Sequence, residues 1–262
     1  MTEPQIRFED GAGYERMMGV WSQLAGAIFI DWLAQRAGLG WIDVGCGSGA
    51  FTELIVERCA PAEVQGIDPS GSQLAFARAR QAARVAQFDH GDAMALPFSK
   101  DRFDAAVMAL VIFFVPDPQK GVAEMARVVR RGGIVGAYTW DILGGGFPNE
   151  PIMAGMRAMG LTPPLPPSAW ASRMKALTRL WIGAGLDAVE TREITVPRTF
   201  RDFDDFWATS TLGANVRLTV AAMSPGDVEL LKAQVRARLP AGGAGSITYS
   251  ARANAIKGFV PS

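Results

Sequence analysis

The sequence predicts an α/β fold in which a doubly wound, mostly parallel sheet carries helices on both faces. Two observations support this class. Five apolar segments with the character of strands alternate with helical segments over the first 140 residues, as in sheets built from strand–helix–strand units. The segment Trp41–Phe51 reads WIDVGCGSGAF, a buried strand followed by three glycines and the start of a helix. That pattern is typical of the nucleotide-binding turn of such sheets.

The composition fits one large folded domain. The chain has 262 residues, 49% of them hydrophobic and 20% charged, which is enough for a full core. The 26 basic and 26 acidic residues balance, so no net field favours nucleic acid or an anionic membrane. Two cysteines and one histidine provide neither a disulfide framework nor a zinc set, and we expect no metal. Because no signal-peptide pattern and no membrane-length apolar run is found, we expect a cytoplasmic location.

A helix is predicted for Tyr14–Ala37, because apolar residues recur there at spacings of three and four. We expect it to cover the edge of the sheet and to end at Gly38 and Gly40. The first strand, Trp41–Val44, follows directly.

The glycine turn comes next, with Gly45 and Gly47 at its centre and Cys46 between them as a small filler residue. Glycine adopts positive φ without steric cost and lets a ligand approach the backbone. Gly45, Gly47 and Ala50 also satisfy G-x-G-x-x-G/A, so this turn alone leaves an NAD-type site open. The residues around the turn must show whether the ligand is a dinucleotide such as NAD or another nucleotide.

Acidic residues follow the second and third predicted strands. Strand Val64–Ile67 delivers Asp68 at its carboxyl end, where ligands of open α/β sheets lie, so this carboxylate is placed to accept both hydroxyls of a ribose. Ser70 is expected to cap the helix Gln73–Ala83. After the third strand, the carboxylate of Asp92 and the backbone N–H of Ala93 match the donor and acceptor edge of an adenine ring.

The remaining elements are predicted from the same patterns. The apolar run Phe103–Phe114 indicates a central strand buried on both faces, and Gly132 and Gly133 are expected to stop the helix that begins at Pro118. A glycine- and proline-rich insertion follows Asp141 and is interpreted as a lid over the substrate. The later elements are a fifth strand at Ile134–Trp140, a helix capped by Ser168, a strand at Val189–Phe200, helices at Asp202–Leu212 and Pro225–Leu239, and a last strand at Ser246–Val260.

Taken together, these motifs resemble the class I S-adenosylmethionine-dependent methyltransferases. The motifs keep the order and spacing of this family over about 100 residues. Their sequences are most similar to the small-molecule branch that includes the ubiquinone and menaquinone C-methyltransferases. The matching segments are DVGCGSG at Asp43–Gly49, GIDPS around Asp68, GDAMALPF at Gly91–Phe98, FDAAVMALVIFFVPDP at Phe103–Pro118 and RVVRRGGIVGAYTW at Arg127–Trp140.

The resemblance implies a fold, a cofactor and residue roles. The fold is a seven-stranded Rossmann-like sheet whose last strand inserts antiparallel between strands five and six, with a small helical lid. The cofactor is S-adenosyl-L-methionine, which becomes S-adenosyl-L-homocysteine. Asp68 holds the ribose, while Asp92 and Ala93 bind the adenine. The methionine part is bordered by Asp43, Gly45, Cys46, Gly47 and Leu110, and Tyr14 and Met18 close over the cofactor.

The implied organisation is a single methyltransferase domain over residues 1–262. Residues 1–40 form the covering helix and residues 41–141 the cofactor-binding core. Residues 142–167 and 201–240 form substrate-lid insertions. Asp43 is expected to help hold the cationic amino-acid end of the cofactor, directly or through water.

The expected reaction is an in-line transfer of the methyl group to a small-molecule acceptor, which needs a base only if the acceptor must lose a proton. His90 lies on the cofactor side and is a poor nominee, while Tyr138 and Asp141 are equally placed by position. No catalytic residue is selected among them. Aromatic and methionine side chains in the insertions suit a flat or lipophilic acceptor; they are Phe147, Met153, Met156, Met159, Phe203, Phe206 and Trp207.

Two alternatives stay open at this stage. An NAD-dependent oxidoreductase would need a catalytic pair such as Tyr-x-x-x-Lys, and neither Tyr138 nor Tyr249 is followed by Lys at that spacing. A non-catalytic or non-methylating member of the S-adenosylmethionine-binding fold would keep the same nucleotide contacts. The sequence does not predict the acceptor, the atom that is methylated or the oligomeric state.

Overall fold

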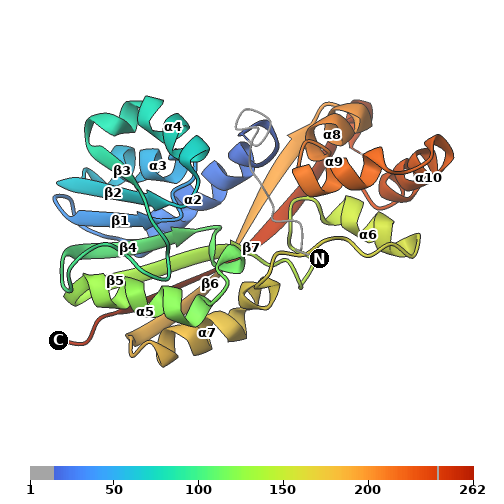
Figure 1. Cartoon of the computed structure of the whole chain (residues 1–262). Helices are drawn as coiled ribbons and strands as arrows, with labels where there is room; N and C mark the ends of the chain where they lie inside the picture. Colours follow the sequence, from blue (N-terminus) through green and yellow to red (C-terminus); the bar gives the residue numbers. More distant parts are fainter. Residues whose placement is uncertain (1–14, 241) are drawn as a thin grey trace.

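The computed structural model describes residues 15–240 and 242–262 and contains a seven-stranded sheet in the order β3-β2-β1-β4-β5-β7-β6 (Figure 1). The first five strands pair in parallel, and β7 pairs antiparallel with both β5 and β6. The predicted fold class and the inserted antiparallel last strand are therefore confirmed. The strands are β1 (Gly40–Val44), β2 (Glu63–Asp68), β3 (Ala86–His90), β4 (Phe103–Ala109), β5 (Val129–Trp140), β6 (Asp187–Phe200) and β7 (Ile247–Phe259).

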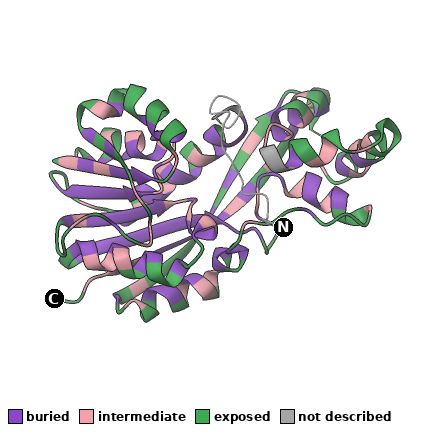
Figure 2. Ribbon diagram, viewed as in Figure 1, coloured by how far each residue is buried: buried purple, intermediate pink, exposed green. Residues whose placement is uncertain are grey.

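Helices cover both faces of the sheet, as doubly wound topology requires. On one face lie α2 (Val20–Leu33), α3 (Ala50–Cys59) and α4 (Gly71–Ala79), and on the other lie α5 (Pro118–Val128) and α7 (Met174–Gly183) (Figure 1). Each face has its own hydrophobic cluster. Figure 2 shows the central strands buried along most of their length and the outer sides of these helices exposed.

A second group of helices, which we name the helical lobe, lies beyond the carboxyl end of the sheet (Figure 1). Strands β6 and β7 extend out of the sheet to meet it, and the ring of Phe206 packs 5.4 Å from Phe200 of β6 and 5.7 Å from Tyr249 of β7. The lobe is also tightly packed internally, because a Cβ atom at Gly155 would lie 2.9 Å from Leu231. Its helices are α6 (Glu150–Ala158), α8 (Phe203–Ser210), α9 (Ala214–Ala221) and α10 (Pro225–Arg236).

The prediction of one long central strand over Phe103–Phe114 is wrong. Strand β4 ends at Ala109, Leu110 has a left-handed φ of +61°, and a 3-10 turn covers Ile112–Phe114. Ile112 and Phe113 are nonetheless buried. The apolar run therefore continues past the strand because the turn after it is also part of the core.

Ser168 does not cap a helix. Its hydroxyl donates a hydrogen bond to the carbonyl of Val115 at 2.8 Å, and helix α7 begins only at Met174, after a 3-10 turn at Ala169–Ser172. Helix α9 was not predicted at all. Its Leu218 side chain is 66% exposed, so the segment has little of the one-sided apolar pattern that marks a packed helix.

Other element boundaries also differ from the predictions. The covering helix is a π-helical turn, Glu15–Gly19, followed by α2, which ends before a left-handed Ala34 rather than at Gly38. The helix after β2 ends at Ala79, with a separate 3-10 turn behind it. Strand β5 starts at Val129, so the two glycines expected to stop helix α5 lie inside a strand. Ser70 does cap α4 as predicted, accepting a hydrogen bond from the Gln73 amide.

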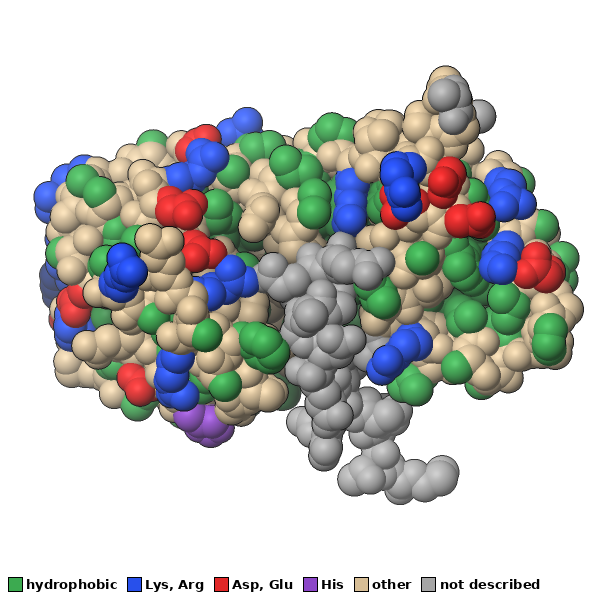
Figure 3. Space-filling view, turned by 90° about the horizontal axis from the view of Figure 1, so that it is seen from above, with side chains coloured by type: hydrophobic (Ala, Val, Ile, Leu, Met, Phe, Trp, Pro, Cys, Tyr) green, Lys and Arg blue, Asp and Glu red, His purple; other side chains and the backbone are tan. Residues whose placement is uncertain are grey.

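The surface carries both signs of charge. Basic and acidic side chains are interspersed over the face seen in Figure 3, consistent with the balanced composition. Within the described part of the chain, no helix has both the length and the apolar character that crossing a bilayer demands.

Candidate functional site

The glycine turn links β1 to α3. Gly45, Gly47 and Gly49 have φ values of +77°, +51° and +78°, which favour glycine at each position. A Cβ atom at Gly45 would lie 2.5 Å from a Val111 methyl group, and one at Gly49 would lie 3.0 Å from the Ala77 side chain. A Cβ atom at Gly47 would have no contact closer than 4.0 Å. Packing therefore explains Gly45 and Gly49, and Gly47 faces the open space that a ligand can use.

Asp68 is fixed at the carboxyl end of β2 by two backbone amides. Its Oδ2 accepts a hydrogen bond from Gly47 N at 2.9 Å, and its Oδ1 accepts one from Ser70 N at 2.8 Å. Burial raises the pKa of this carboxyl, while the two amides oppose the shift. Each oxygen keeps a further acceptor position. The side chain is therefore held ready to accept two adjacent hydroxyl groups.

Asp43 lies in β1 with no solvent exposure. Its Oδ2 accepts a hydrogen bond from Thr52 Oγ1 at 2.7 Å, whereas its Oδ1 has no donor among the described residues. Burial, with a smaller contribution from the charge of Asp68, raises the pKa of Asp43 to about 7. A buried carboxylate oxygen without a partner is costly. A cationic or hydrogen-bond-donating ligand would supply the missing interaction.

The loop after β3 is more open. Asp92 is exposed, and its Oδ1 accepts a hydrogen bond from Met94 N at 2.8 Å. Ala93 is half-buried beside it. His90 pairs in register with Asp68 across the β2–β3 ladder and is exposed. These residues share the sheet edge with Asp43 and Asp68, as the sequence predicted.

Cys46 is buried within the glycine turn. Burial, reinforced by the charges of Asp43 and Asp68, raises the pKa of its thiol far above the ordinary value. The thiol therefore stays protonated and is not a nucleophile, which agrees with its interpretation as a small packing residue.

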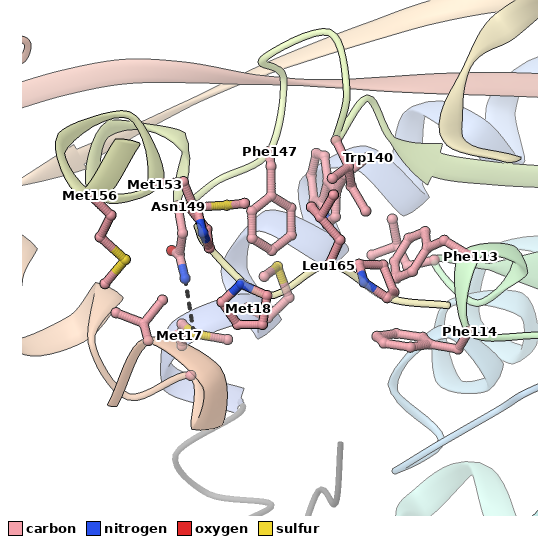
Figure 4. Close-up of a pocket in the computed structure, with 17 residues that line it drawn as sticks. Met17, Met18, Phe113, Phe114, Trp140, Phe147, Asn149, Met153, Met156 and Leu165 are labelled. Atoms are coloured by element: carbon pink, nitrogen blue, oxygen red, sulfur yellow. Dashed lines mark hydrogen bonds between the residues drawn. The ribbon is translucent and has the colours of Figure 1, made fainter. Parts of the chain in front are cut away.

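An apolar cavity adjoins this edge and extends toward the helical lobe (Figure 4). Met18 and Leu110, both predicted to border the cofactor, line it. Leu110 holds its left-handed conformation while its amide donates a hydrogen bond to Tyr138 O at 2.8 Å, and such conformations occur often at functional sites. Tyr14 lies outside the described residues. The other lining residues are Met17, Phe113, Phe114, Trp140, Ile142, Phe147, Asn149, Met153, Met156, residues 163–166, Gly213 and Val216.

The cavity contains few polar groups. Asn149 donates hydrogen bonds to Ser210 O at 3.2 Å and Met17 Sδ at 3.7 Å, the latter drawn in Figure 4. Trp140 has a buried indole N–H with no acceptor among the described residues. None of the described lining side chains titrates near neutral pH. The cavity therefore suits a mainly apolar molecule.

Neither Tyr138 nor Asp141 lines this cavity. The Tyr138 ring packs 4.9 Å from Phe29 on the α2 face of the sheet, and its hydroxyl donates a hydrogen bond to Ser22 O at 3.3 Å. Asp141 pairs with Arg252 at 2.5 Å and lines a different pocket. Position along the chain had made both residues plausible bases. Asp141 points away from the cavity because successive side chains at a strand end point to opposite faces. Tyr138 shares a face with Trp140 but packs between Phe29 and Phe51.

Some of the aromatic residues expected to contact an acceptor have another role. Phe147, Met153 and Met156 line the cavity, and Met159 packs against the core beside it. Phe203, Phe206 and Trp207 of α8 instead pack among themselves and against β6 and β7. The cavity also contains residues that were not predicted from the sequence, namely Asn149, Val216 and the proline run 163–166. The only available signal was the position of that run in the insertion.

The site and topology agree with the resemblance found in the sequence. A glycine turn after β1, buried carboxylates on β1 and β2, and an antiparallel β7 between β5 and β6 match the arrangement that a resemblance to class I methyltransferases implies. Residues 42–136 match the family model described as "Methyltransferase domain". This segment contains the glycine turn and Asp43, Asp68, Asp92 and Leu110.

Curated proteins with similar sequences are also methyltransferases. The chain is 44% identical over 93 residues to 2-methyl-6-phytyl-1,4-hydroquinone methyltransferase 2 of Oryza sativa subsp. japonica, covering 36% of this chain and 27% of that protein. It is 38% identical over 108 residues to a ubiquinone/menaquinone biosynthesis C-methyltransferase of Roseobacter denitrificans, covering 40% and 43%. The chain thus matches less than two thirds of the length of these curated relatives.

A solved structure extends the fold comparison to nearly the whole chain. Phosphoethanolamine N-methyltransferase 2 of Haemonchus contortus, solved with S-adenosylhomocysteine, has a TM-score of 0.61 and 16% identity and covers 97% of this chain and 58% of its own. Residues 42–136 are therefore similar to a methyltransferase domain, and the chain shares the fold of this solved methyltransferase. Both findings agree with the resemblance to class I methyltransferases, for which the sequence predicts S-adenosylmethionine as the cofactor. The comparisons give no support to the NAD-type interpretation.

The residues present fit this cofactor. The unpaired Oδ1 of Asp43 offers an acceptor to an ammonium group, and the open space beside Gly47 leaves room for a ligand. The pre-positioned carboxylate of Asp68 suits a ribose.

Proposed function

We propose that this protein transfers a methyl group from S-adenosylmethionine to a small, mainly apolar acceptor that carries at least one oxygen atom. The observation that supports it best is the apolar cavity, because it is lined by Met18 and Leu110, the two residues that the family resemblance assigns to the cofactor. A methyl donor at that edge and an acceptor in the cavity would be adjacent. Relatives that act on hydroquinones and quinone precursors suggest an electron-rich ring as the acceptor class.

We further propose the residue roles implied by the family resemblance. Asp68 holds the ribose, Asp92 and Ala93 bind the adenine, and Leu110 borders the methionine portion. The remaining roles at that portion belong to Asp43, Gly45, Cys46 and Gly47, with Met18 and Tyr14 closing the site.

The division of the chain is likewise a proposal. Residues 1–40 would cover the site, residues 41–141 would bind the cofactor, and residues 142–167 and 201–240 would form the lid over the acceptor. The contribution of Phe147, Met153 and Val216 to the cavity supports this lid role. A cytoplasmic location also stays a prediction, with two free, buried cysteines in its favour.

The mechanism relies on alignment. The cofactor supplies a methyl group on a positively charged sulfur. The protein binds the cofactor through the carboxylates and positions the acceptor next to it in a cavity that excludes water. Correct alignment of the two reactants can lower the activation barrier by ~7–11 kcal/mol. Because none of the described lining residues is titratable, we expect an acceptor that reacts without a protein base. An already ionised oxygen would meet this requirement, as would a ring carbon of an ionised hydroquinone whose C–H proton passes to solvent after the transfer.

Calorimetric titration tests the cofactor first. S-adenosylmethionine and S-adenosylhomocysteine should bind the purified protein, whereas NAD should not. Binding of NAD alone would contradict the proposal.

A series of hydroquinones with increasing alkyl chains then tests the acceptor, using cofactor with a labelled methyl group. Each CH₂ buried in the cavity contributes about 0.8 kcal/mol, so KM should fall several-fold per carbon until the cavity is full. Transfer to the shortest hydroquinone with no effect of chain length would exclude the cavity as the acceptor site.

A further inference from the structure

The π-helical turn Glu15–Gly19 forms part of the wall of the apolar cavity. Met17 and Met18 both line the cavity and are only 6% and 4% exposed. No side chain caps helix α2, which follows the turn. π-Helical turns are rare and occur often at functional sites. Since helix ends fray, the contacts made by Met17 determine how firmly this wall is held in place.

Arg198 of β6 holds the backbone of the turn. Its Nη1 donates a hydrogen bond to Met17 O at 2.8 Å. The guanidinium also lies over the ring of Phe200, 4.6 Å from the ring centre, and 5.9 Å from that of Trp21. Burial lowers the pKa of Arg198, but arginine stays charged near neutral pH. The bond to Met17 is therefore charge-assisted, a class roughly twice as strong as a neutral hydrogen bond.

A second polar contact reaches the side chain of Met17. Asn149 Nδ2 donates to Met17 Sδ at 3.7 Å (Figure 4), and to Ser210 O at 3.2 Å. A thioether sulfur is a weak acceptor. A Cβ atom at Gly213 would lie 2.8 Å from the same sulfur, so the start of α9 packs directly against Met17. Of the two polar contacts, the charged bond from Arg198 is the stronger.

Both polar contacts are anchored to the strands that join the sheet to the helical lobe (Figure 1). Arg198 on β6 pairs in register with Tyr249 on β7, and the Tyr249 ring stacks 5.9 Å from Phe200. The Tyr249 hydroxyl donates a hydrogen bond to Pro148 O at 2.5 Å, one residue before Asn149. Two paired strands therefore form a firm base from which the turn is held.

From this arrangement we propose that Arg198 is a positioning residue that keeps the turn Glu15–Gly19 closed over the ligand site. The inference rests on the proposed function in one respect, the role of Met18 at the cofactor. Arg198 does not itself line the cavity, so it acts through Met17 and Met18. Without its bond to Met17 O, the turn opens more often and a bound cofactor leaves sooner.

Hydrogen exchange of the ligand-free protein tests the contact itself. Arg198→Met keeps an unbranched apolar side chain beside the rings and removes the donor. The amides of residues 20–24 should then exchange at least about fivefold faster, because helical amides bond to carbonyls four or five residues earlier, which here belong to the turn. Arg192→Met is the matched control, since Arg192 is exposed on the same strand, and should change this exchange less than about twofold. Equal exchange in Arg198→Met and the wild type would overturn the proposal.

The dissociation rate of S-adenosylhomocysteine, followed by tryptophan fluorescence in stopped flow, tests the effect on the ligand. The rate should rise at least about fivefold in Arg198→Met and change less than about twofold in Arg192→Met. Arg198→Lys restores a charged donor and should release the ligand more slowly than Arg198→Met. A merely structural role would lower Tm without these differences. Equal rates in Arg198→Met and the wild type, or in the Lys and Met variants, would overturn the proposal.

The two measurements separate this proposal from the proposed function. If the wild type does not bind S-adenosylhomocysteine, the cofactor assignment is contradicted, and the exchange experiment alone decides whether Arg198 holds the turn. If the ligand binds and leaves all variants at the wild-type rate, the role of Arg198 is overturned and the cofactor assignment is unaffected.

Discussion

At the carboxyl ends of β1 and β2, buried carboxylates are held by directional hydrogen bonds, whereas the cavity beside β4 is lined by methionine, phenylalanine and proline side chains. The first region contains Asp43 Oδ1, which has no hydrogen-bond partner among the described residues. The second region can bind a ligand mainly through its shape and its apolar surface. The difference indicates that the cofactor is selected by charge and geometry and the acceptor by burial. Substitutions in the first region should therefore have large, pH-dependent effects on cofactor binding. Substitutions in the second region should have smaller effects, confined to the acceptor.

The largest effect is expected for Asp68→Ala. Loss of two hydrogen bonds to a charged group, each of about 1.5–3 kcal/mol, should weaken S-adenosylhomocysteine binding by about 100-fold or more. Calorimetry measures this directly. Asp89→Ala is the matched control, because Asp89 is an exposed carboxylate on β3 that contacts Gln65. Cofactor affinity in Asp68→Ala equal to that of the control would remove Asp68 from the site.

A pH-dependent effect is expected for Asp43. Its pKa rises from 3.8 to about 7 on folding because of burial, so the folded protein keeps this proton to a higher pH than the unfolded chain does. The associated stability is fully present below about pH 4 and is lost as the pH rises through about 7. Urea unfolding of the free protein across this range should show the decline, and Asp43→Asn should remove this contribution.

Cofactor binding should show the opposite trend at the same residue. If ionised Asp43 pairs with the ammonium group, affinity for S-adenosylhomocysteine should rise as the pH increases through about 7, by roughly tenfold. Asp43→Asn should abolish that rise. An identical pH profile in the variant would show that Asp43 does not contact the cofactor.

A smaller effect, confined to the acceptor, is expected for Trp140→Phe. Removing the buried N–H should lower kcat/KM for an oxygen-bearing acceptor by about tenfold or less and leave S-adenosylhomocysteine binding unchanged. Trp41→Phe provides the control, since Trp41 also has a buried, unpaired N–H among the described residues but does not line the cavity. Equal losses of kcat/KM in the two variants would indicate a general packing effect.

The smallest effect is expected for His90→Ala. The side chain is exposed at the end of β3 and does not line the cavity, so turnover should fall less than about tenfold. Loss of a general base would reduce turnover by about 10²–10⁴. A loss of that size, with cofactor binding intact, would make His90 the catalytic base.

The cofactor edge could be predicted from the sequence because its signals are local. Gly47 follows β1 and Asp68 ends β2, and the parallel pairing of these strands places both residues at one edge. The cavity could not be predicted in the same way, since Met17, Asn149 and Val216 come from three distant segments. Their meeting depends on how the helical lobe packs.

Two of the wrong secondary-structure predictions have the same physical cause. The apolar run after Ala109 was interpreted as strand because burial alone does not distinguish a strand from a buried turn. Likewise, Ser168 has the composition of a helix cap, but its hydroxyl is used by Val115 O. In both places tertiary packing determined the local structure and sequence preference did not.

The position of β7 has a consequence for how the chain acquires its structure. Strand β6 lies at the edge of the sheet and pairs with β7, which follows it in the chain after 46 intervening residues and separates it from β5. During synthesis β6 therefore emerges before its neighbour exists, and the growing sheet must keep its β5 edge free until β7 arrives. Such late, long-range pairing slows folding and leaves strand edges exposed to mispairing in the meantime.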